Sequence, residues 1–402
     1  MSTHAPDAGS LGAWRLPDEL EELKAMTARF MAREVRPAED LVESDAFRLP
    51  SDVLLPLQAK ARAAGLWCIE SPAEYGGGGF SLLAQCIVAE EASQCRMGAY
   101  TPACGVFGWD PPNVIFDGTP EQIKQYAVPT IDSGTNTFVA ISEPGGGADP
   151  ARSIQTRAVR DGDDWIINGT KMWISQADMS DWGVVFARTE AGKGGSAISS
   201  FIVDADSPGL TMTPIPVIRS WYPCELSFVD VRVPGANLLG EPGLGFRLAQ
   251  RWLVHGRVPY AAATLGIAQA SLALAIEHAR NRQAFGSALA DKQAVQWMIA
   301  DSEIEIRAAR LLVYQAAWKA DLGLDFKTDA SIAKVYATET AGRVVDRCIQ
   351  ILGGLGVAKA MPTERWYREL RIKRIGEGPS EVHRMVVARD LLKGSAGGGR
   401  NP

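Results

Sequence analysis

Residues 374–384 read Arg-Ile-Gly-Glu-Gly-Pro-Ser-Glu-Val-His-Arg. Two glycines flank Glu377, and glycine lets the backbone come close to a flat or bulky group. Pro379 disfavours helical conformation in the residue before it, so one helix should end upstream and another should follow. The stretch predicts a tight connection between two helices, with the carboxylate of Glu377 at its tip. Taken alone, a solvated turn glutamate is the more common situation, so the rest of the chain has to decide.

Composition narrows the class of protein. The chain has 402 residues, a formal charge of −6 and 46% apolar residues, enough for a large core and two to three domains. It carries no run of Lys or Arg that would indicate nucleic acid. The six cysteines lack CxxC spacing and the four histidines are dispersed, which favours reduced thiols and no metal site. Without an apolar run of membrane-spanning length or a signal-peptide pattern, we expect a cytoplasmic protein with no membrane insertion.

The periodicity of apolar residues changes twice along the chain. From residue 17 apolar residues recur at three- and four-residue spacing, which predicts helices, the first of them ended or redirected by Pro37. After Phe138 short β-rich runs follow, and Asp-Gly at 161–162 with Asn-Gly at 168–169 indicates a hairpin. From residue 246 helical spacing returns, and apolar residues from Val295 to Ala316 form a narrow seam of the helix-bundle type.

We therefore expect a multidomain α+β fold. It has an N-terminal helical domain (17–135), a middle antiparallel β-barrel or sandwich (136–242), a C-terminal helical bundle (243–393), and flexible tails at 1–16 and 394–402.

Two motifs in the β-rich part suggest a ligand. Residues 138–149 read Phe-Val-Ala-Ile-Ser-Glu-Pro-Gly-Gly-Gly-Ala-Asp, a strand followed by a glycine loop. Such a loop offers N–H groups and the Ser142 hydroxyl to a polar ring or phosphate, although many glycine-rich turns bind nothing. Trp173 and Ser175 should point to one face of a strand, which suits an aromatic heterocycle as well as it suits a core tryptophan.

Two more motifs lie at helix ends. Residues 280–286 read Arg-Asn-Arg-Gln-Ala-Phe-Gly and precede Gln293; an arginine beside an exposed Phe can bind a diphosphate, but solvated helix ends look alike. Residues 350–356 read Gln-Ile-Leu-Gly-Gly-Leu-Gly, and glycine is also an ordinary helix stop.

In order and spacing, these five stretches resemble the acyl-CoA dehydrogenase family. Residues 72–77 (Pro-Ala-Glu-Tyr-Gly-Gly) and 118–122 (Gly-Thr-Pro-Glu-Gln) resemble further motifs of the same family. The resemblance runs from about residue 17 to 393. It implies a C-terminal four-helix bundle and FAD bound between the β domain and that bundle. It also implies an acyl-CoA substrate, electron-transferring flavoprotein as electron acceptor, and a homodimer or homotetramer.

Position by position, the resemblance implies roles for individual residues. Glu377 matches the catalytic base, which removes the α-proton of the thioester, while the β-hydride goes to flavin N5 and a trans-2-enoyl-CoA forms. The residues implied to bind FAD are Ile141, Ser142, Trp173, Ser175, Arg282, Phe285, Gln293, Gln350, Gly353, Gly354, Pro379 and Glu381. The residues implied to lie near the acyl-CoA are Ala148, Arg257, Gly376 and Gly378.

The chain departs from the family pattern near the base. Gly376 stands where the family usually has Tyr, which should widen the acyl pocket, and Pro379 stands where it usually has Thr. Ser142 and Ser175 replace threonines but keep the hydroxyl, whereas Ala148 replaces a serine. The Gly-Pro-x-Glu-Val-His version of the loop resembles one functionally diverse branch, so the acyl group stays open.

Three alternatives remain at the level of the sequence. One is an oxidase of the same fold that passes electrons to O2. Another is a flavin enzyme with a non-CoA substrate, such as a nitroalkane oxidase or a monooxygenase. The third is a non-catalytic flavoprotein, against which the joint presence of Glu377, Arg257 and Ser175 argues.

Overall fold

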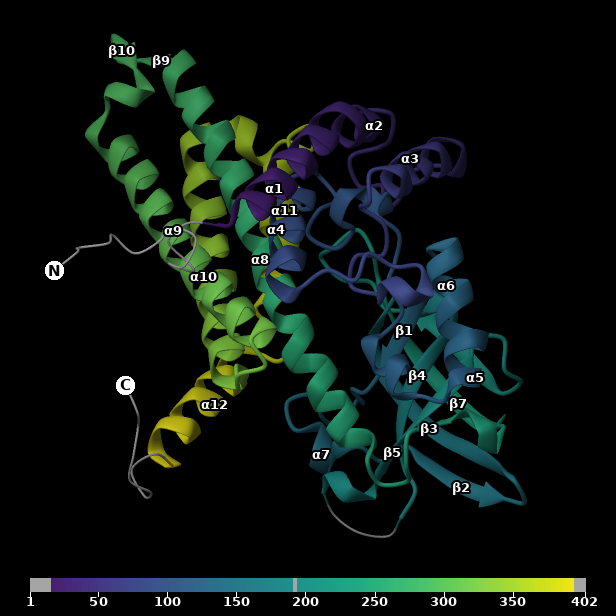
Figure 1. The fold of residues 1–402 in the computed structure, drawn as a ribbon. Coiled ribbons are helices and arrows are strands. Elements are labelled where there is room, and N and C mark those ends of the chain that lie inside the picture. The colour runs from purple at the N-terminus through teal and green to yellow at the C-terminus, as the bar shows by residue number, and fades with distance from the viewer. Residues whose placement is uncertain (1–15, 191–193, 394–402) are drawn as a thin grey trace, which may run out of the picture. The chain divides into compact units, whose positions relative to one another are not determined.

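The computed structural model describes residues 16–190 and 194–393 (Figure 1). The tails predicted to be flexible lie outside the described residues, apart from Leu16, which is buried. Contacts between Cα atoms group the chain into two compact units. The helical unit combines residues 1–59, 80–106 and 254–402, and the sheet unit combines residues 60–79 and 107–253.

The helical unit contains the long helices of the chain. Its helices and strands are α1 (Asp18–Phe30), α2 (Arg36–Glu39), most of α3 (Ser51–Ala63), α4 (Leu82–Ala92), most of α8 (Gly245–Asn281), β9 (Gln283–Ala284), β10 (Ser287–Ala288), α9 (Gln293–Asp321), α10 (Lys327–Leu352), α11 (Pro362–Lys373) and α12 (Ser380–Lys393).

The sheet unit contains β1 to β8 and three short helices. These elements are α5 (Pro120–Gln122), α6 (Val128–Ser133), β1 (Asn136–Ala140), α7 (Pro150–Ser153), β2 (Arg157–Asp161), β3 (Asp164–Ser175), β4 (Ser180–Arg188), β5 (Ile198–Asp204), β6 (Leu210–Pro214), β7 (Pro223–Val233) and β8 (Leu238–Leu239).

Pro37 does not end the first helix, so the first of the two outcomes expected from the sequence, an end or a redirection, is wrong. Between α1 and α2 the chain forms a π-helical turn over Met31–Val35, and the helix continues through Pro37 to Glu39. A proline inside a helix lacks an N–H donor and its ring crowds the carbonyl one turn earlier. The wider π turn lies directly before Pro37 and changes the hydrogen-bond register there, so the helical path is kept.

The core of the helical unit lies among α4, α8, α9 and α10. Small residues such as Ala261 on α8, Ala316 on α9 and Ala333 on α10 are fully buried and pack together with larger side chains. The predicted seam on α9 is confirmed, since Ile306, Ala309, Val313 and Ala316 are buried. Alanine at these positions lets the long helices approach closely.

Helix α8 is long and apolar enough to cross a membrane by length and composition alone. However, 67% of its most apolar 18-residue window is buried inside the protein. Residues such as Leu265 and Ile267 have no exposed surface, which is typical of a core helix in a soluble protein.

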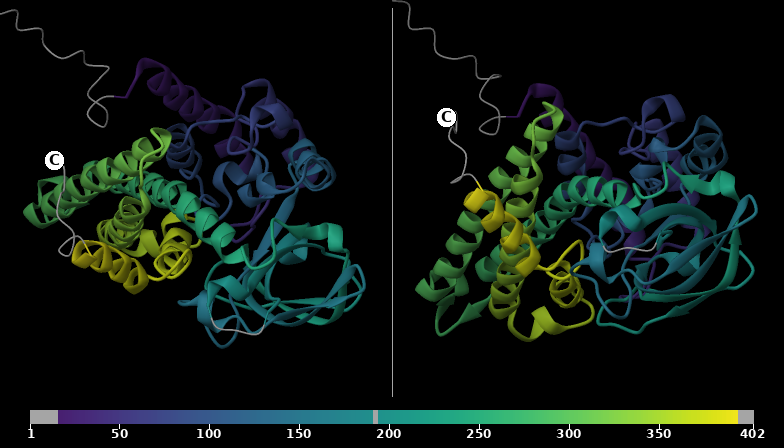
Figure 2. Two further views of the ribbon diagram at one scale, coloured as in Figure 1. Left: turned by 60° about the horizontal axis from the view of Figure 1, so that its bottom comes forward. Right: turned by 90° about the horizontal axis from the view of Figure 1, so that it is seen from below.

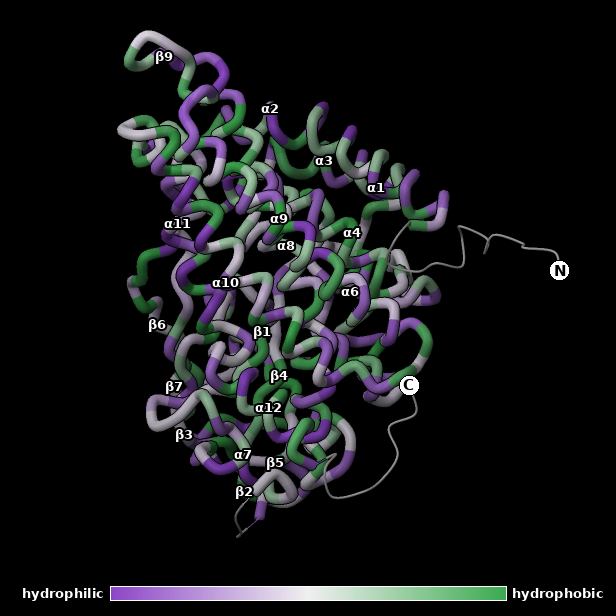
Figure 3. Tube along the Cα trace, turned by 90° about the vertical axis from the view of Figure 1, so that its left-hand side faces the viewer, coloured by the Kyte–Doolittle hydropathy of each residue, from purple (hydrophilic) through white to green (hydrophobic). Residues whose placement is uncertain are grey.

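The sheet unit contains one eight-stranded, mixed sheet. The strands follow the order β6-β7-β3-β2-β4-β5-β8, and β1 pairs with β4 in parallel. Figure 2 shows the sheet strongly curved, and Figure 3 shows β4 in the green of hydrophobic residues. No pairing joins β6 to β8 among the described residues, so the expected barrel is not closed, and the sheet is not purely antiparallel.

The two glycine dipeptides behave differently. Asp161 pairs with Asp164 across a tight turn, which confirms the hairpin between β2 and β3. The Asn-Gly pair at 168–169 is not a turn, because β3 continues to Ser175 and its register against β7 shifts between Ile167 and Gly169. An added Cβ at Gly169 would lie 2.6 Å from Thr156 Oγ1, so glycine is required there by a close approach.

Candidate active site

The predicted connection between two helices is confirmed. Residues 374–379 link α11 to α12, and two backbone hydrogen bonds tighten the turn: Gly376 N–H donates to the Ile372 carbonyl and Ser380 N–H to the Arg374 carbonyl (3.0 and 3.2 Å). Glu377 has φ +57° and Gly378 has φ +94°. A residue with a Cβ rarely adopts this left-handed conformation, and such outliers gather at functional sites.

Positive charge surrounds the half-buried carboxylate of Glu377. Desolvation raises the pKa of Glu377 above its usual range, while Arg257, Lys334 and Lys373 act in the opposite direction. Burial in turn lowers the pKa of Arg257, and the Glu377 carboxylate opposes that shift. A carboxyl group whose pKa is raised by burial is a better proton acceptor than one in water.

The space beside Gly376 is not empty. A Cβ added to Gly376 would lie 2.8 Å from the Tyr260 hydroxyl oxygen, so a tyrosine on α8 occupies the region where a side chain at 376 would begin. Lys373 Nζ lies 3.8 Å from the centroid of the Tyr260 ring. Tyr260 therefore takes up part of the space that a side chain at 376 would fill, and the widening of the acyl pocket by Gly376 stays a prediction.

In the sheet unit, two motifs that are thirty residues apart meet. The Met172 N–H donates to the Ser142 carbonyl (2.9 Å), and Lys171 Nζ donates to the Ile141 carbonyl (3.1 Å). Lys171 also forms a buried ion pair with Glu143 (2.9 Å). These contacts fix the end of β1 and its glycine loop against β3, as a shared ligand site requires.

Trp173 is exposed in an unusual way. The register of β3 against β7 shifts between Lys171 and Ile174, and Trp173 in this bulge has φ +66°. Its indole is 53% exposed, whereas Ile174 beside it is buried. An exposed indole on a strained, non-glycine backbone position is what a flat aromatic ligand needs, and an ordinary core tryptophan would be buried.

Ser175 has a neighbour that the sequence did not reveal. The exposed Ser175 accepts a hydrogen bond at Oγ from Arg219 in the β6–β7 connection (2.9 Å). Arg219 itself is buried. No motif marks Arg219, because it lies 44 residues away in the sequence and becomes adjacent only when β7 pairs with β3.

The residues assigned to the far half of FAD are all on the surface of the helical unit. Phe285 is 99% exposed and, with Gly286, forms the turn of the β9–β10 hairpin at positive φ (+52° and +80°). A fully exposed phenylalanine in a left-handed turn gains nothing from its own chain. The other exposed members of this group are Arg282, Gln293, Gln350, Gly353 and Gly354.

Within each unit the structure brings some of the predicted residues together. In the helical unit Arg257, Gly376, Glu377, Gly378 and Pro379 are close in space or sequence, and the exposed Glu381 follows in α12. In the sheet unit, Ile141 and Ser142 meet the β3 bulge. The exposed Ala148 lies between the bridge of Glu143 with Gly146 and the start of α7.

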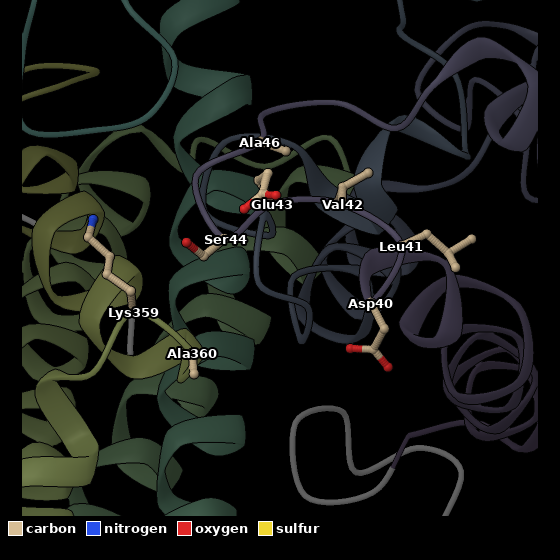
Figure 4. A pocket seen from close by; sticks show the side chains of 8 residues that line it. All are labelled: Asp40, Leu41, Val42, Glu43, Ser44, Ala46, Lys359 and Ala360. Carbon is tan, nitrogen blue, oxygen red and sulfur yellow. The ribbon is translucent and has the colours of Figure 1, made fainter.

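Two further concave or ligand-like features of the helical unit are formed by other residues. A depression of about 600 Å³ is lined by Asp40, Glu43, Ser44, Lys359 and neighbouring residues (Figure 4). One group in the described part of the chain brings possible metal ligands within 4.8 Å of one another: Glu39, Cys95 and Cys104. Two of these residues are engaged otherwise: Glu39 accepts a hydrogen bond from Arg96 N–H, and the Cys95 thiol donates to the Ala92 carbonyl.

Family models match nearly the whole chain. The N-terminal, middle and C-terminal domain models of acyl-CoA dehydrogenase match residues 17–134, 139–231 and 243–392. Short-chain specific acyl-CoA dehydrogenase of Bos taurus is 38% identical over 382 residues, covering 94% of this chain and 91% of its own.

Solved structures agree. Butyryl-CoA dehydrogenase from Megasphaera elsdenii has a TM-score of 0.84 at 31% identity, covering 94% of this chain and 99% of that one. A structure described under the electron transferring flavoprotein of Acidaminococcus fermentans has the same TM-score at 32% identity and the same coverage. Glutaryl-CoA dehydrogenase from Mycobacterium smegmatis in complex with FADH2 has a TM-score of 0.82 at 25% identity, covering 94% and 95%.

The chain belongs to the acyl-CoA dehydrogenase family. It is accordingly an FAD-dependent oxidoreductase that acts on acyl-CoA. The sheet unit fits that cofactor, since the exposed Trp173 and the Ser142 loop, held against each other by Met172 and Lys171, offer a flat surface beside hydroxyl and amide donors.

Proposed function

We propose that the protein removes the α-proton of an acyl-CoA thioester with Glu377 and forms the trans-2-enoyl-CoA. The observation that supports this most directly is the left-handed Glu377, half-buried among Arg257, Lys334 and Lys373. A thioester α-proton is only weakly acidic, so a carboxylate must be partly desolvated to accept it at a useful rate. Burial supplies that desolvation, and the nearby cations oppose the resulting rise in the pKa of Glu377.

The other residues bind and orient. FAD, when bound, accepts the β-hydride at flavin N5. In this proposal Trp173 covers the flavin ring, Ser175 donates a hydrogen bond to it, and Ile141 and Ser142 contact its polar edge. Pro379 and Glu381 also border it. Arg282, Phe285, Gln293, Gln350, Gly353 and Gly354 bind the remainder of the dinucleotide, and their exposure suits a contact with a second copy of the chain.

In this proposal Gly376 and Gly378 border the acyl-CoA, and Arg257 lies near its CoA moiety. The proposed domain boundaries are 17–135, 136–242 and 243–393, the electron acceptor is an electron-transferring flavoprotein, and the assembly is a homodimer or homotetramer in the cytoplasm. The names of relatives favour short acyl chains, while the Tyr260–Gly376 arrangement leaves branched or cyclic groups to be tested.

The test measures anaerobic reduction of the flavin by a panel of acyl-CoAs from C4 to C16, including branched and cyclic ones. Reduction is monitored as the loss of flavin absorbance at about 450 nm. With the best substrate, Glu377→Gln should slow reduction by at least about 10²–10⁴-fold while FAD content is kept. Glu303→Gln, at an exposed ion pair on α9, is the matched control. Reduction at a near wild-type rate by Glu377→Gln would refute the assignment of the base.

A further inference from the structure

The backbone around Glu377 needs external support. A residue with a Cβ adopts the left-handed region only at a steric cost. Glu377 pays this cost, and Gly378 continues in positive φ, so two consecutive peptide carbonyls are turned away from helical directions. Such a conformation persists only where surrounding groups stabilise it.

Three donors from three helices meet these two carbonyls. The Glu377 carbonyl accepts a hydrogen bond from Arg257 Nε on α8 (3.1 Å) and lies 3.1 Å from His383 Nε2 on α12. The Gly378 carbonyl accepts a hydrogen bond from Lys334 Nζ on α10 (2.7 Å). Lys334 and His383 have no exposed surface at all.

We propose that Lys334 and His383 are positioning residues, which hold the carbonyls of Gly378 and Glu377 and thereby aim the Glu377 carboxylate. The proposal rests on Glu377 being the base. Neither residue needs to touch substrate or cofactor. They act through the peptide groups on each side of the Glu377–Gly378 bond.

The hydrogen bond fixes the protonation of His383. A carbonyl oxygen only accepts, so Nε2 must carry the proton that it shares with Glu377. Burial, and then Arg257 and Lys334, lower the pKa of His383 to about 4. The ring therefore stays neutral with its single proton on Nε2. An added Cβ at Gly378 would lie 3.1 Å from Nε2, so the absence of a side chain there lets the imidazole approach.

Lys334 adds an electrostatic effect to its hydrogen bond. Burial lowers its pKa to about 8, and the Glu377 carboxylate is the first group that opposes this shift. The groups facing Glu377 are Arg257 from α8, Lys334 from α10, Lys373 from α11 and the neutral His383 from α12. Replacing Lys334 with a neutral residue leaves two cations and raises the pKa of Glu377.

The experiment measures flavin reduction at saturating acyl-CoA between pH 5.5 and 9 in the FAD-bound enzyme. Lys334→Met should slow reduction about 10–100-fold, the range expected for a misaimed catalytic group, and move the acid limb of the profile to higher pH. Lys334→Arg, which keeps charge and donors, should restore the acid limb. Lys319→Met, which removes a lysine paired with Asp329, should change neither.

His383 provides a second, independent arm. His383→Leu should slow reduction about 10–100-fold with little movement of the acid limb, because the imidazole is neutral. His383→Gln, whose amide can donate to the Glu377 carbonyl, should recover most of the rate. If His383→Leu and Lys334→Met do not fold, His383→Gln and Lys334→Arg still test the proposal, because it requires flavin reduction near the wild-type rate in both.

For Lys334, a merely structural role would lower melting temperature or FAD content without moving the acid limb. For His383, whose replacement leaves the acid limb in place, a merely structural role would show no recovery of the rate in His383→Gln. The proposal is overturned if Lys334→Met and His383→Leu reduce flavin at the wild-type rate, or if Gln rescues no better than Leu. Failure of the base itself is seen separately: Glu377→Gln would then retain reduction, whatever the other variants do.

Discussion

Lys171→Met should damage both stability and cofactor retention. Lys171 is fully buried, and its Nζ bridges the Glu143 carboxylate (2.9 Å) and the Ile141 carbonyl (3.1 Å). Removing one partner of a buried ion pair leaves an uncompensated charge and costs about 3–5 kcal/mol. In a unit of this size, each kcal/mol of lost stability lowers Tm by about 2–4 °C. The variant should therefore lose roughly 6–20 °C in Tm.

The structure also predicts the stability of the double variant Lys171→Met with Glu143→Gln. Glu143 accepts hydrogen bonds from the N–H groups of Gln155 and Thr156, and a glutamine at 143 can still accept them. In Lys171→Met with Glu143→Gln, no buried charge remains, so the double variant should lose less stability than the two single variants together.

The assay is thermal unfolding of the FAD-bound protein by circular dichroism, with FAD fluorescence reporting release. FAD should leave the Lys171→Met variant earlier, because the end of β1 loses the Lys171–Ile141 contact and is held to β3 by the Met172–Ser142 hydrogen bond alone. Lys124→Met, at an exposed position of the same unit, is the control. The reasoning is refuted if the Tm loss of the double variant equals the sum of the losses of the two single variants. It is also refuted if Lys171→Met releases FAD at the same temperature as the wild-type protein.

Three further predictions follow from exposed or crowded side chains. Arg282→Ala should weaken FAD retention far more than it slows reduction at saturating FAD, measured by FAD titration and stopped flow; unchanged FAD affinity would contradict the assignment. Tyr260→Phe should open space beside Gly376 and raise kcat/KM for branched relative to straight-chain acyl-CoAs, and an unchanged ratio would count against it. Trp297 and Ile304 belong to an exposed apolar stripe on α9 that has seven-residue spacing and ends at Trp318. The double variant Trp297→Asp with Ile304→Asp should weaken the proposed oligomer and give smaller particles in light scattering. The control Glu303→Gln should leave the particle size unchanged.

Local sequence signals indicated residues of the candidate site, but not the residues that hold them in position. Glu377 is marked by its flanking glycines, and Trp173 and Ser175 by their alternation in a strand, because these features depend on neighbours in the chain. Lys334 carries no such mark: it lies in the middle of α10 and meets Gly378 only through helix packing.

The same dependence on residues far apart in the sequence explains which features of the fold were predicted wrongly. Whether Pro37 ends a helix depends on a π turn that no propensity reveals, and the parallel pairing of β1 with β4 depends on tertiary topology. The Asn-Gly pair at 168–169 has the composition of a turn. Its surroundings instead make it a bulge, because β7 extends the ladder past it.

The left-handed conformation of Glu377 sets activity against stability. Glycine adopts positive φ without the steric cost that glutamate bears, and the greater freedom of glycine in the unfolded chain offsets at most about 1 kcal/mol of that gain. Glu377→Gly should therefore relieve the steric cost of this turn, while it removes the proposed proton acceptor and leaves Arg257, Lys334 and Lys373 without the carboxylate that they face. It would also leave a space where a small carboxylate from solution, such as formate or acetate, can stand in for the missing side chain and partly restore turnover. In its proposed role as the base, Glu377 is a residue of costly backbone conformation that the protein keeps where its chemistry takes place.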